Sequence, residues 1–283
     1  MSAILLIHAP DRTGLVASVT DFIYKNNGNI LHLDQHVDPD QQLFFMRVEW
    51  DCDSFSIPTQ EIGASFEKEV AKRFDMVSRC YLSDEIPRVA IFVSKLSHCL
   101  YDLLSRYQSG EWQIKIPVII SNHPDMESVA HQFGIAYHFF QITSENKLAQ
   151  ETAQKELLKK ERIALVILAR YMQVLSDAFV AFYPNQIINI HHSFLPAFPG
   201  ADPYRAAALR GVKIIGATSH YVTGDLDKGP IIEQDVVHVS HRDTLSDMIR
   251  KGQDLEKVVL ARAVFRHLRR TILVHNNRTI VFG

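Results

Sequence analysis

The sequence predicts an α/β protein with two domains. Short apolar runs alternate with segments of helical spacing along the whole chain, which is the pattern of strands and helices packed in layers. Over residues 1–83 the order is βαββαβ, as in the ferredoxin-like split unit. A polar linker follows at 84–88. Strands then alternate with helices over residues 89–283, which predicts a doubly wound, mostly parallel sheet.

The N-terminal domain is expected to be a small antiparallel sheet backed by two helices. Apolar residues at helical spacing follow the turn that contains Gly14, and Gly28 ends that helix. A hairpin at 38–40 joins the two middle strands. The expected elements are the strands Ile4–His8, Ile30–Val37, Leu43–Trp50 and Met76–Leu82, and the helices Leu15–Asn26 and Thr59–Phe74.

The second domain is expected to contain seven strands. Each is a short apolar run, which suits a strand buried in a parallel sheet. The expected strands are Val89–Val93, Val118–Ser121, Ala136–Phe139, Leu165–Leu168, Ile187–His191, Ile214–His220 and Ile231–Val237. Amphipathic stretches near 100–104, 126–133 and 147–161 predict the intervening helices, and the tail from Leu245 to Val274 is expected to be rich in helix.

Composition argues against several classes of protein. A formal net charge of −2 provides no field that would attract nucleic acid or an anionic membrane. The three cysteines form no CxxC pair, so we expect neither a disulfide framework nor a metal site. No apolar stretch reaches the roughly 20 residues that span a bilayer. The apolar N-terminus lacks a basic leader and reads as a first strand, so a cytoplasmic location is expected.

The strand Ile187–His191 ends in chemically useful side chains. Asn189 and His191 are two residues apart, so on a strand they project from the same face. Ligands of open α/β sheets bind just beyond the carboxyl ends of the strands. An amide and an imidazole there can polarise a carbonyl and stabilise an oxyanion. Asp227, in a turn before the last strand, is a candidate to activate the attacking group, and Asp225 competes with it on chemistry alone.

A third segment carries no obvious catalytic group. The stretch from Arg170 to Leu175 follows a buried strand and precedes the helix capped by Ser176. Its backbone N–H and C=O groups are suited to grip a flat heterocycle, although a plain hydrophobic connector accounts for the same pattern.

These three segments together resemble the formyl-tetrahydrofolate hydrolase and transferase superfamily over residues 88–283. The resemblance rests on Asn189-Ile190-His191-x-Ser193, on the segment that begins with Asp227, and on Arg170-Tyr171-Met172. It implies that Asn189 and His191 hold the formyl group and that Asp227 pairs with His191 and manages proton transfers. It further implies a substrate-binding set comprising the backbone of Met172, Val174 and Leu175, which holds the pterin, with Thr218 and His220 lining or supporting the site. The substrate would be 10-formyltetrahydrofolate, with no bound cofactor.

The N-terminal domain resembles the ACT module, which commonly binds amino acids. Asp11-Arg12-Thr13-Gly14-Leu15 opens its first helix and Gly28-Asn29-Ile30 closes it. Free amides at a helix start suit a carboxylate. The resemblance implies a small amino-acid effector, glycine or methionine, bound near Asp11, Gly14, Leu15 and Asn29, and a homo-oligomer. A dimerisation or purely structural module is the alternative.

The acceptor of the formyl group decides between branches of the superfamily. Transferases that act on glycinamide ribonucleotide carry a glycine-rich loop after the first strand, whereas the stretch from Val93 to Leu100 has no glycine. Charge and length argue against transfer to tRNA. Water remains as the acceptor. The ACT-like N-terminal domain, the stretch from Ser94 to Leu100 (Ser-Lys-x-Ser-His-Cys-Leu) and the stretch from Asn189 to Pro196 (Asn-Ile-His-His-Ser-Phe-Leu-Pro) resemble the hydrolase branch over the whole chain. This resemblance implies release of formate for purine synthesis and balance of the folate pool. Transfer to an amine, or a folate or amino-acid sensor without activity, are the alternatives.

Overall fold

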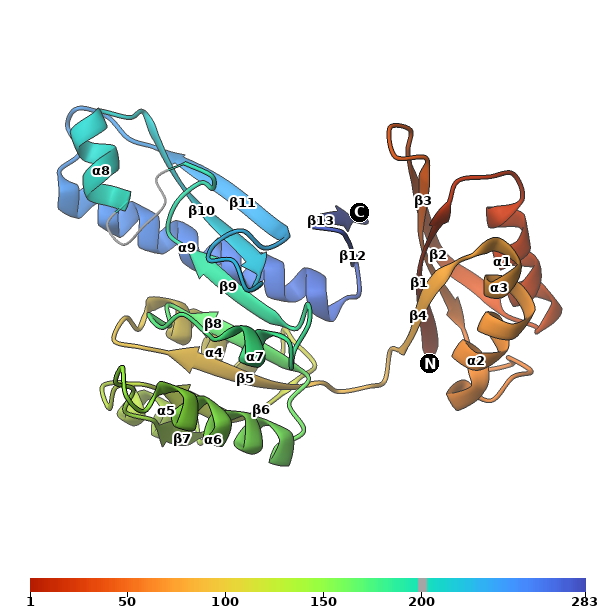
Figure 1. Ribbon diagram of the computed structural model, residues 1–283, viewed down its shortest axis with the longest axis horizontal. Coiled ribbons are helices and arrows are strands. Elements are labelled where there is room, and N and C mark those ends of the chain that lie inside the picture. The colour runs from red at the N-terminus through yellow and green to blue at the C-terminus, as the bar shows by residue number, and fades with distance from the viewer. Residues whose placement is uncertain (198–202) are drawn as a thin grey trace. The chain divides into compact units, whose positions relative to one another are not determined.

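The computed structural model describes residues 1–197 and 203–283 and divides into two compact units (Figure 1). The first comprises Met1–Glu85 with Arg269–His275 and Thr279–Gly283. The second comprises Ile86–Leu268 with Asn276–Arg278. The second domain was expected to run to residue 283, but most residues after Leu268 belong to the first unit.

The stretch from Leu245 to Val274 is rich in helix, as expected, because α9 covers Leu245–Leu268, and the chain then ends in an unpredicted hairpin of β12 (Ile272–His275) and β13 (Arg278–Val281). The apolar side chains of the hairpin explain why it belongs to the first unit. Leu273 and Phe282 are buried in a cluster with Leu6 and Phe45, which come from strands of the N-terminal unit. The hairpin thus forms a small hydrophobic core together with strands of the N-terminal unit.

The N-terminal unit has the predicted fold, with four antiparallel strands in the order β2-β3-β1-β4. One large core that includes Trp50 and Phe66 lies between this sheet and the helices. The expected helix 59–74 is present but irregular, since it contains a 3-10 turn and a π turn. In chain order the elements are β1 (Ser2–Pro10), α1 (Leu15–Lys25), β2 (Asn29–Asp38), β3 (Leu43–Asp51), a 3-10 turn (Thr59–Glu61), α2 (Ile62–Phe66), a π turn (Glu67–Ala71), α3 (Lys72–Phe74) and β4 (Val77–Leu82).

The second unit is built on a seven-stranded sheet in the order β11-β10-β9-β8-β5-β6-β7. Its first five strands in sequence are parallel, and β10 and β11 run antiparallel to their neighbours. The strands are β5 (Arg88–Val93), β6 (Lys115–Ser121), β7 (Ala136–Phe139), β8 (Leu165–Ala169), β9 (Ile187–His191), β10 (Ile214–Tyr221) and β11 (Ile231–His238). The helices are α4 (His98–Gln108), α5 (Glu127–Gln132), α6 (Lys147–Lys160), α7 (Asp177–Val180), α8 (Pro203–Arg210) and α9 (Leu245–Leu268).

Strand order places the site. The chain builds outward from β5 through β6 to β7, then returns to the other side of β5 with β8. The order therefore reverses between β5 and β8, and such a switch point opens a crevice at the carboxyl ends of the strands. The residues that follow β8, and His191 at the end of β9, lie at this edge of the sheet.

Candidate active site

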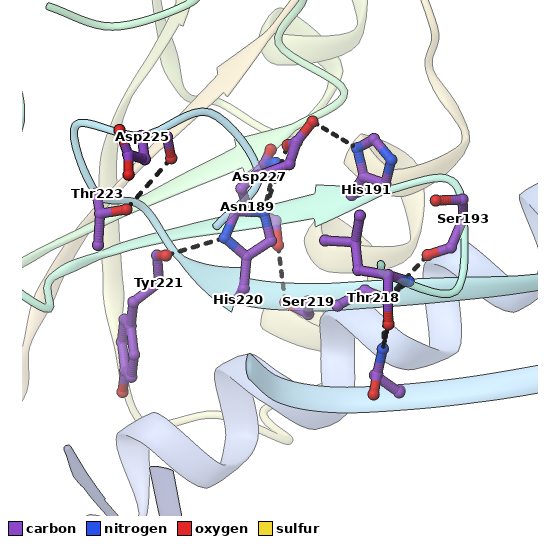
Figure 2. A network of polar contacts seen from close by, with 12 residues as sticks. Asn189, His191, Ser193, Thr218, Ser219, His220, Tyr221, Thr223, Asp225 and Asp227 are labelled. Atoms are coloured by element: carbon purple, nitrogen blue, oxygen red, sulfur yellow. Dashed lines mark hydrogen bonds and ion pairs between the residues drawn. The ribbon is translucent and has the colours of Figure 1, made fainter. Parts of the chain in front are cut away.

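His191 and Asp227 form the central pair of the site (Figure 2). The Nδ1 atom of His191 lies 3.2 Å from Oδ2 of Asp227. The imidazole is almost fully buried, and its other nitrogen, Nε2, has no hydrogen-bond partner among the residues that the structure describes. A buried polar atom without a partner is costly, and its presence in a cavity marks a place for a ligand. His191 is thus fixed at one nitrogen and available at the other.

Asp227 lies in a tight turn that follows β10. Asp227 has a left-handed backbone with φ of 55°. Two residues later, a Cβ atom on Gly229 would lie 1.7 Å from the carbonyl oxygen of Tyr221, so only glycine permits this close approach. The Tyr221 amide donates to the carbonyl of Pro230 at 2.9 Å and closes the turn. The sequence Asp-Lys-Gly-Pro therefore determines where the carboxylate lies.

A second imidazole contacts the same carboxylate. Nε2 of His220 lies 3.6 Å from Oδ1 of Asp227 and 3.3 Å from Nδ2 of Asn189. The opposite nitrogen, Nδ1, donates to the backbone carbonyl of Tyr221 at 2.9 Å. The register of β9 against β10 places His220 opposite Asn189, which explains their contact. His220 therefore supports both the amide and the carboxylate of the site.

The carboxylate of Asp227 is held in its ionised form. Burial opposes ionisation, but hydrogen bonds from His191 and His220 outweigh it, so the pKa of Asp227 lies far below its ordinary value. A carboxylate with so low a pKa is a weak base at neutral pH. Its strongest contribution is a fixed negative charge that orients His191 and stabilises positive charge on that ring.

A cavity of about 280 Å³ opens in front of these groups. Its apolar wall includes Met172 and Val174, whose side chains are each about half exposed. The loop after β8 is held at both ends: the amide of Met172 donates to Oγ of Ser94 at 2.9 Å, and the amide of Ser176 donates to Glu151 at 3.0 Å. A rigid apolar wall with backbone groups at its edge suits a flat heterocycle.

Seven of the expected substrate and catalytic residues line this one cavity: Met172, Val174, Leu175, Asn189, His191, His220 and Asp227. The amide of Met172 is already engaged by Ser94, whereas the amides of Val174 and Leu175 have no partner within the described ranges. The competing aspartate, Asp225, lines the rim with a carboxylate that is 76% exposed, so it lacks the setting of Asp227.

Thr218, expected in the substrate-binding set, does not line the cavity. It lies opposite His191 in the register of β9 and β10, but the turn after β9 folds over it. Its hydroxyl donates to the carbonyl of Ser193 at 2.8 Å and accepts from the amide of Leu195 at 3.0 Å. Thr218 therefore holds the turn that follows β9.

The expected effector residues lie in the N-terminal unit at the start of α1 and of β2. Gly14 is the N-cap of α1 with φ of 95°, and the cap has no side-chain hydrogen bond. Asp11 and Asn29 are exposed, whereas Leu15 is buried in the core, with only 2% of the residue exposed.

Sequence reasoning missed a buried polar group beside the cavity. Glu256 of α9 is fully buried and lies 2.8 Å from Nε2 of His98 and 3.5 Å from Nε of Arg170. Arg170 and His192 also line the cavity. The signal was present in the sequence, because Glu256 stands on the same helical stripe as the apolar Val259 and Leu260.

Two family models match the chain. The model described as formyl transferase matches residues 87–264, and the ACT domain model matches residues 3–64. The chain is 57% identical over 283 residues to a formyltetrahydrofolate deformylase of Synechocystis, covering 100% of this chain and 99% of that protein. No helix in the described ranges combines the length and apolar character needed to cross a membrane.

Solved structures agree with these matches. A formyltetrahydrofolate deformylase from Pseudomonas syringae pv. tomato has a TM-score of 0.97 at 44% identity, covering 100% of this chain and 94% of that one. A glycinamide ribonucleotide transformylase from Symbiobacterium toebii has a TM-score of 0.67 at 29% identity, with 70% and 95% covered. The deformylase match spans both units, and the transformylase match covers a smaller part of this chain.

Proposed function

Because this chain belongs to the formyl transferase family and, within it, to the formyltetrahydrofolate deformylases, we propose that Asn189, His191 and Asp227 are its catalytic residues. The chain hydrolyses 10-formyltetrahydrofolate to formate and tetrahydrofolate. Neither transfer to an amine nor a role as an inactive sensor is favoured. The observation that best supports the catalytic assignment is the state of His191. An ionised carboxylate anchors its Nδ1, and its Nε2 has no partner among the described residues.

The proposed reaction begins with the pterin against the wall formed by Met172, Val174 and Leu175. The formyl oxygen accepts hydrogen bonds from Nδ2 of Asn189 and Nε2 of His191. Water attacks the formyl carbon, and the two donors stabilise the oxyanion of the tetrahedral intermediate. The oxyanion then collapses and the carbon–nitrogen bond breaks. The proton lost by water is relayed through His191, which Asp227 orients, to the departing folate nitrogen; formic acid then ionises, so the products are tetrahydrofolate, formate and one released proton.

The roles of Asp227 and His191 differ in this scheme. The fixed negative charge of Asp227 orients the imidazole and the attacking water and stabilises the imidazolium. The imidazole of His191 has its second nitrogen, Nε2, without a partner among the described residues and lines the cavity, so it is the better proton carrier. His220 and Thr218 take supporting roles, His220 by contacting Asn189 and Asp227, and Thr218 through the turn after β9.

The test is a steady-state assay with the full chain, 10-formyltetrahydrofolate and no amine. We expect formate and tetrahydrofolate in equal amounts, with both products lost in the His191→Ala variant. Folate binding without formate release by the native protein would instead favour the sensor. A product that forms only when an amine is added would favour the transferase.

We propose in addition that the ACT domain binds a free amino acid, glycine or methionine. Support comes from the start of α1, where Gly14 leaves the first amides of the helix without a side-chain cap and where Asp11 and Asn29 are exposed. Uncapped amides favour a carboxylate, and Asp11 favours an ammonium group. Calorimetry with each amino acid, repeated on Asp11→Ala, tests this; no heat with either compound would contradict it.

A homo-oligomer is part of the same proposal. Strand β2 is an edge strand of the ACT sheet and exposes Leu31 and, in part, Ile30 and Leu33. An exposed apolar edge strand tends to pair with another chain. Light scattering of the native protein and of a Leu31→Lys variant is expected to show an oligomer that the variant weakens.

The cytoplasmic location stays a prediction, and fractionation of cells tests it.

A further inference from the structure

A buried polar cluster, which we call the Glu256 cluster, adjoins the reaction cavity and is not used by the proposed mechanism. It consists of His98, Arg170, Tyr204 and Glu256. The carboxylate of Glu256 is fully buried and contacts His98 at 2.8 Å, the hydroxyl of Tyr204 at 2.6 Å and Nε of Arg170 at 3.5 Å. Four segments distant in sequence therefore meet at one charge.

Two local features show that the fold accommodates this cluster at a cost. Arg170 has a left-handed backbone with φ of 60°, which a residue with a side chain adopts unfavourably. A Cβ atom on Gly252, one turn before Glu256, would lie 2.0 Å from the hydroxyl of Tyr204. Glycine within a helix is unfavourable, but here it makes room for that ring. Strain of this kind persists where the surrounding structure enforces it, often at functional sites.

Geometry alone also fits a metal ion, because His98, Cys99 and Glu256 can bring their ligand atoms within 4.8 Å of one another. The chemistry does not favour one. Burial raises the pKa of Cys99 well above its ordinary value, so the thiol stays protonated. Both oxygens of Glu256 already contact protein groups. The guanidinium of Arg170 already supplies the positive charge that a metal ion would bring to this carboxylate.

The carboxylate of Glu256 is ionised despite its burial. Burial opposes ionisation, but the hydrogen bond of His98, the charge of Arg170 and the hydroxyl of Tyr204 together hold the pKa of Glu256 below its ordinary value. Burial, reinforced by Glu256, raises the pKa of Tyr204, so its hydroxyl stays protonated and donates. The cluster is thus a fixed ion pair with hydrogen-bonded flanks.

The cluster stands beside the reaction centre. Arg170 and His192 line the reaction cavity next to His191. His192 and Tyr204 also line a second, mostly apolar cavity of about 170 Å³, and their rings lie 5.8 Å apart. Arg170 is 9% exposed, and its Nε has no hydrogen-bond partner in the described part of the chain. The cluster and His192 therefore separate the formyl-binding cavity from the neighbouring space.

We propose that Arg170, paired with Glu256, whose carboxylate is itself held by His98 and Tyr204, is a specificity-determining wall that directs the formyl group to water and away from amines. An amine that approaches from this side must displace a buried ion pair, whereas water needs no such room. Most alkylamines are protonated at neutral pH and are repelled by the guanidinium. The inference rests on the proposed function, because it concerns the acceptor at the same site.

The two outcomes differ in one bond. With water, a carbon–oxygen bond forms, the carbon–nitrogen bond to folate breaks, and the products are tetrahydrofolate and formic acid, which ionises to formate and a proton. With a primary amine, a new carbon–nitrogen bond forms, the same folate bond breaks, and the products are an N-formylamine and tetrahydrofolate. In both cases one proton moves from the nucleophile to the folate nitrogen.

The experiment measures the ratio of N-formylglycinamide to formate when the full chain turns over 10-formyltetrahydrofolate in the presence of glycinamide. Arg170→Gly removes the side chain and suits the left-handed backbone. We expect it to raise the ratio at least about tenfold, a typical size for discrimination by a pocket wall. Arg162→Gly is the matched control, because Arg162 also has a left-handed backbone, with φ of 51°, but is exposed and outside the cavity.

Two further measurements keep the test decisive. If Arg170→Gly does not fold, Tyr204→Phe, which removes one oxygen atom, is expected to raise the ratio in the same direction. The inference is wrong if folded Arg170→Gly gives the same product ratio as the Arg162→Gly control. If Arg170→Gly does not fold, the same result with Tyr204→Phe contradicts the inference. Formate release by the native protein without glycinamide is scored separately, so failure of hydrolysis itself is distinguished from failure of this inference.

Discussion

Asp227 holds His191 at one ring nitrogen, with 3.2 Å between Oδ2 and Nδ1, and Nε2 of the same ring has no partner among the described residues. The same carboxylate lies 3.6 Å from His220. One partly buried charge therefore contacts two imidazoles and, through His220, the amide of Asn189. In the proposed mechanism, we therefore expect the loop that carries Asp227 to matter as much as the strand that carries His191.

Replacing Asp227 by asparagine is expected to lower kcat for formate release by at least about 100-fold, because an amide of the same shape removes the charge. The measurement is the initial rate of formate production with purified protein. Asp225→Asn is the matched control, since Asp225 lies in the same loop with an exposed carboxylate, and it is expected to retain its rate. Equal rates in the two variants would remove Asp227 from the mechanism.

His191→Ala is expected to lower kcat by the equivalent of roughly 2.7–4 kcal/mol, the loss typical of one preorganised oxyanion donor. Folate affinity should change little, because the pterin wall is formed by other residues. Stopped-flow rates and a Kd from fluorescence separate the two effects. His131→Ala, at an exposed position of α5, serves as the control. A weakened Kd with an unchanged kcat would argue that His191 only binds.

The sequence predicted the catalytic strand better than it predicted the loop partners. Asn189 and His191 stand out because a spacing of two at a strand end fixes their common face. Asp227 was distinguished from Asp225 only through the family resemblance. The physical difference lies in the turn at Gly229, which requires knowledge of the close contact with Tyr221.

Long-range packing explains what the sequence did not reveal. Thr218 has the correct face and register, but the turn after β9 covers it, and strand alternation cannot predict that. Glu256 becomes meaningful only when α9 is placed beside His98 and Arg170. The C-terminal hairpin was not predicted, because its apolar residues are buried against β1 and β3, which lie over 200 residues earlier in the chain.

Ser94→Ala is expected to raise KM for 10-formyltetrahydrofolate about three- to tenfold with little change in kcat. The Ser94 hydroxyl accepts the Met172 amide and donates to Asn122 at 2.6 Å, so its loss loosens the pterin wall by the worth of about one hydrogen bond. Full steady-state curves separate KM from kcat. Ser109→Ala, at the exposed end of α4, is the control, and a fall in kcat alone would contradict the positioning role.

The ionisation of Asp227 predicts a pH dependence of stability. A carboxyl group whose folded pKa lies below its ordinary value of 3.8 stabilises the fold above that pH, and the stabilisation is lost as pH falls toward the folded pKa. Asp227→Asn should therefore be less stable than the native protein by a constant amount from pH 7 to about pH 5. The gap should narrow below about pH 4. Urea midpoints at each pH measure it, and a gap that widens with acid would refute this.

Gly229→Ala is expected to destabilise the second unit by roughly 2 kcal/mol or more and to reduce formate release, because the new methyl group would meet the backbone oxygen of Tyr221 at 1.7 Å. The backbone cannot give way without moving Asp227. Gly224→Ala is the matched control in the same loop: its methyl group would meet Oδ1 of Asp177 at 2.6 Å, the mobile end of a side chain. Urea unfolding and the formate assay should separate the two variants. If both fold and turn over equally, the turn at Gly229 does not position Asp227.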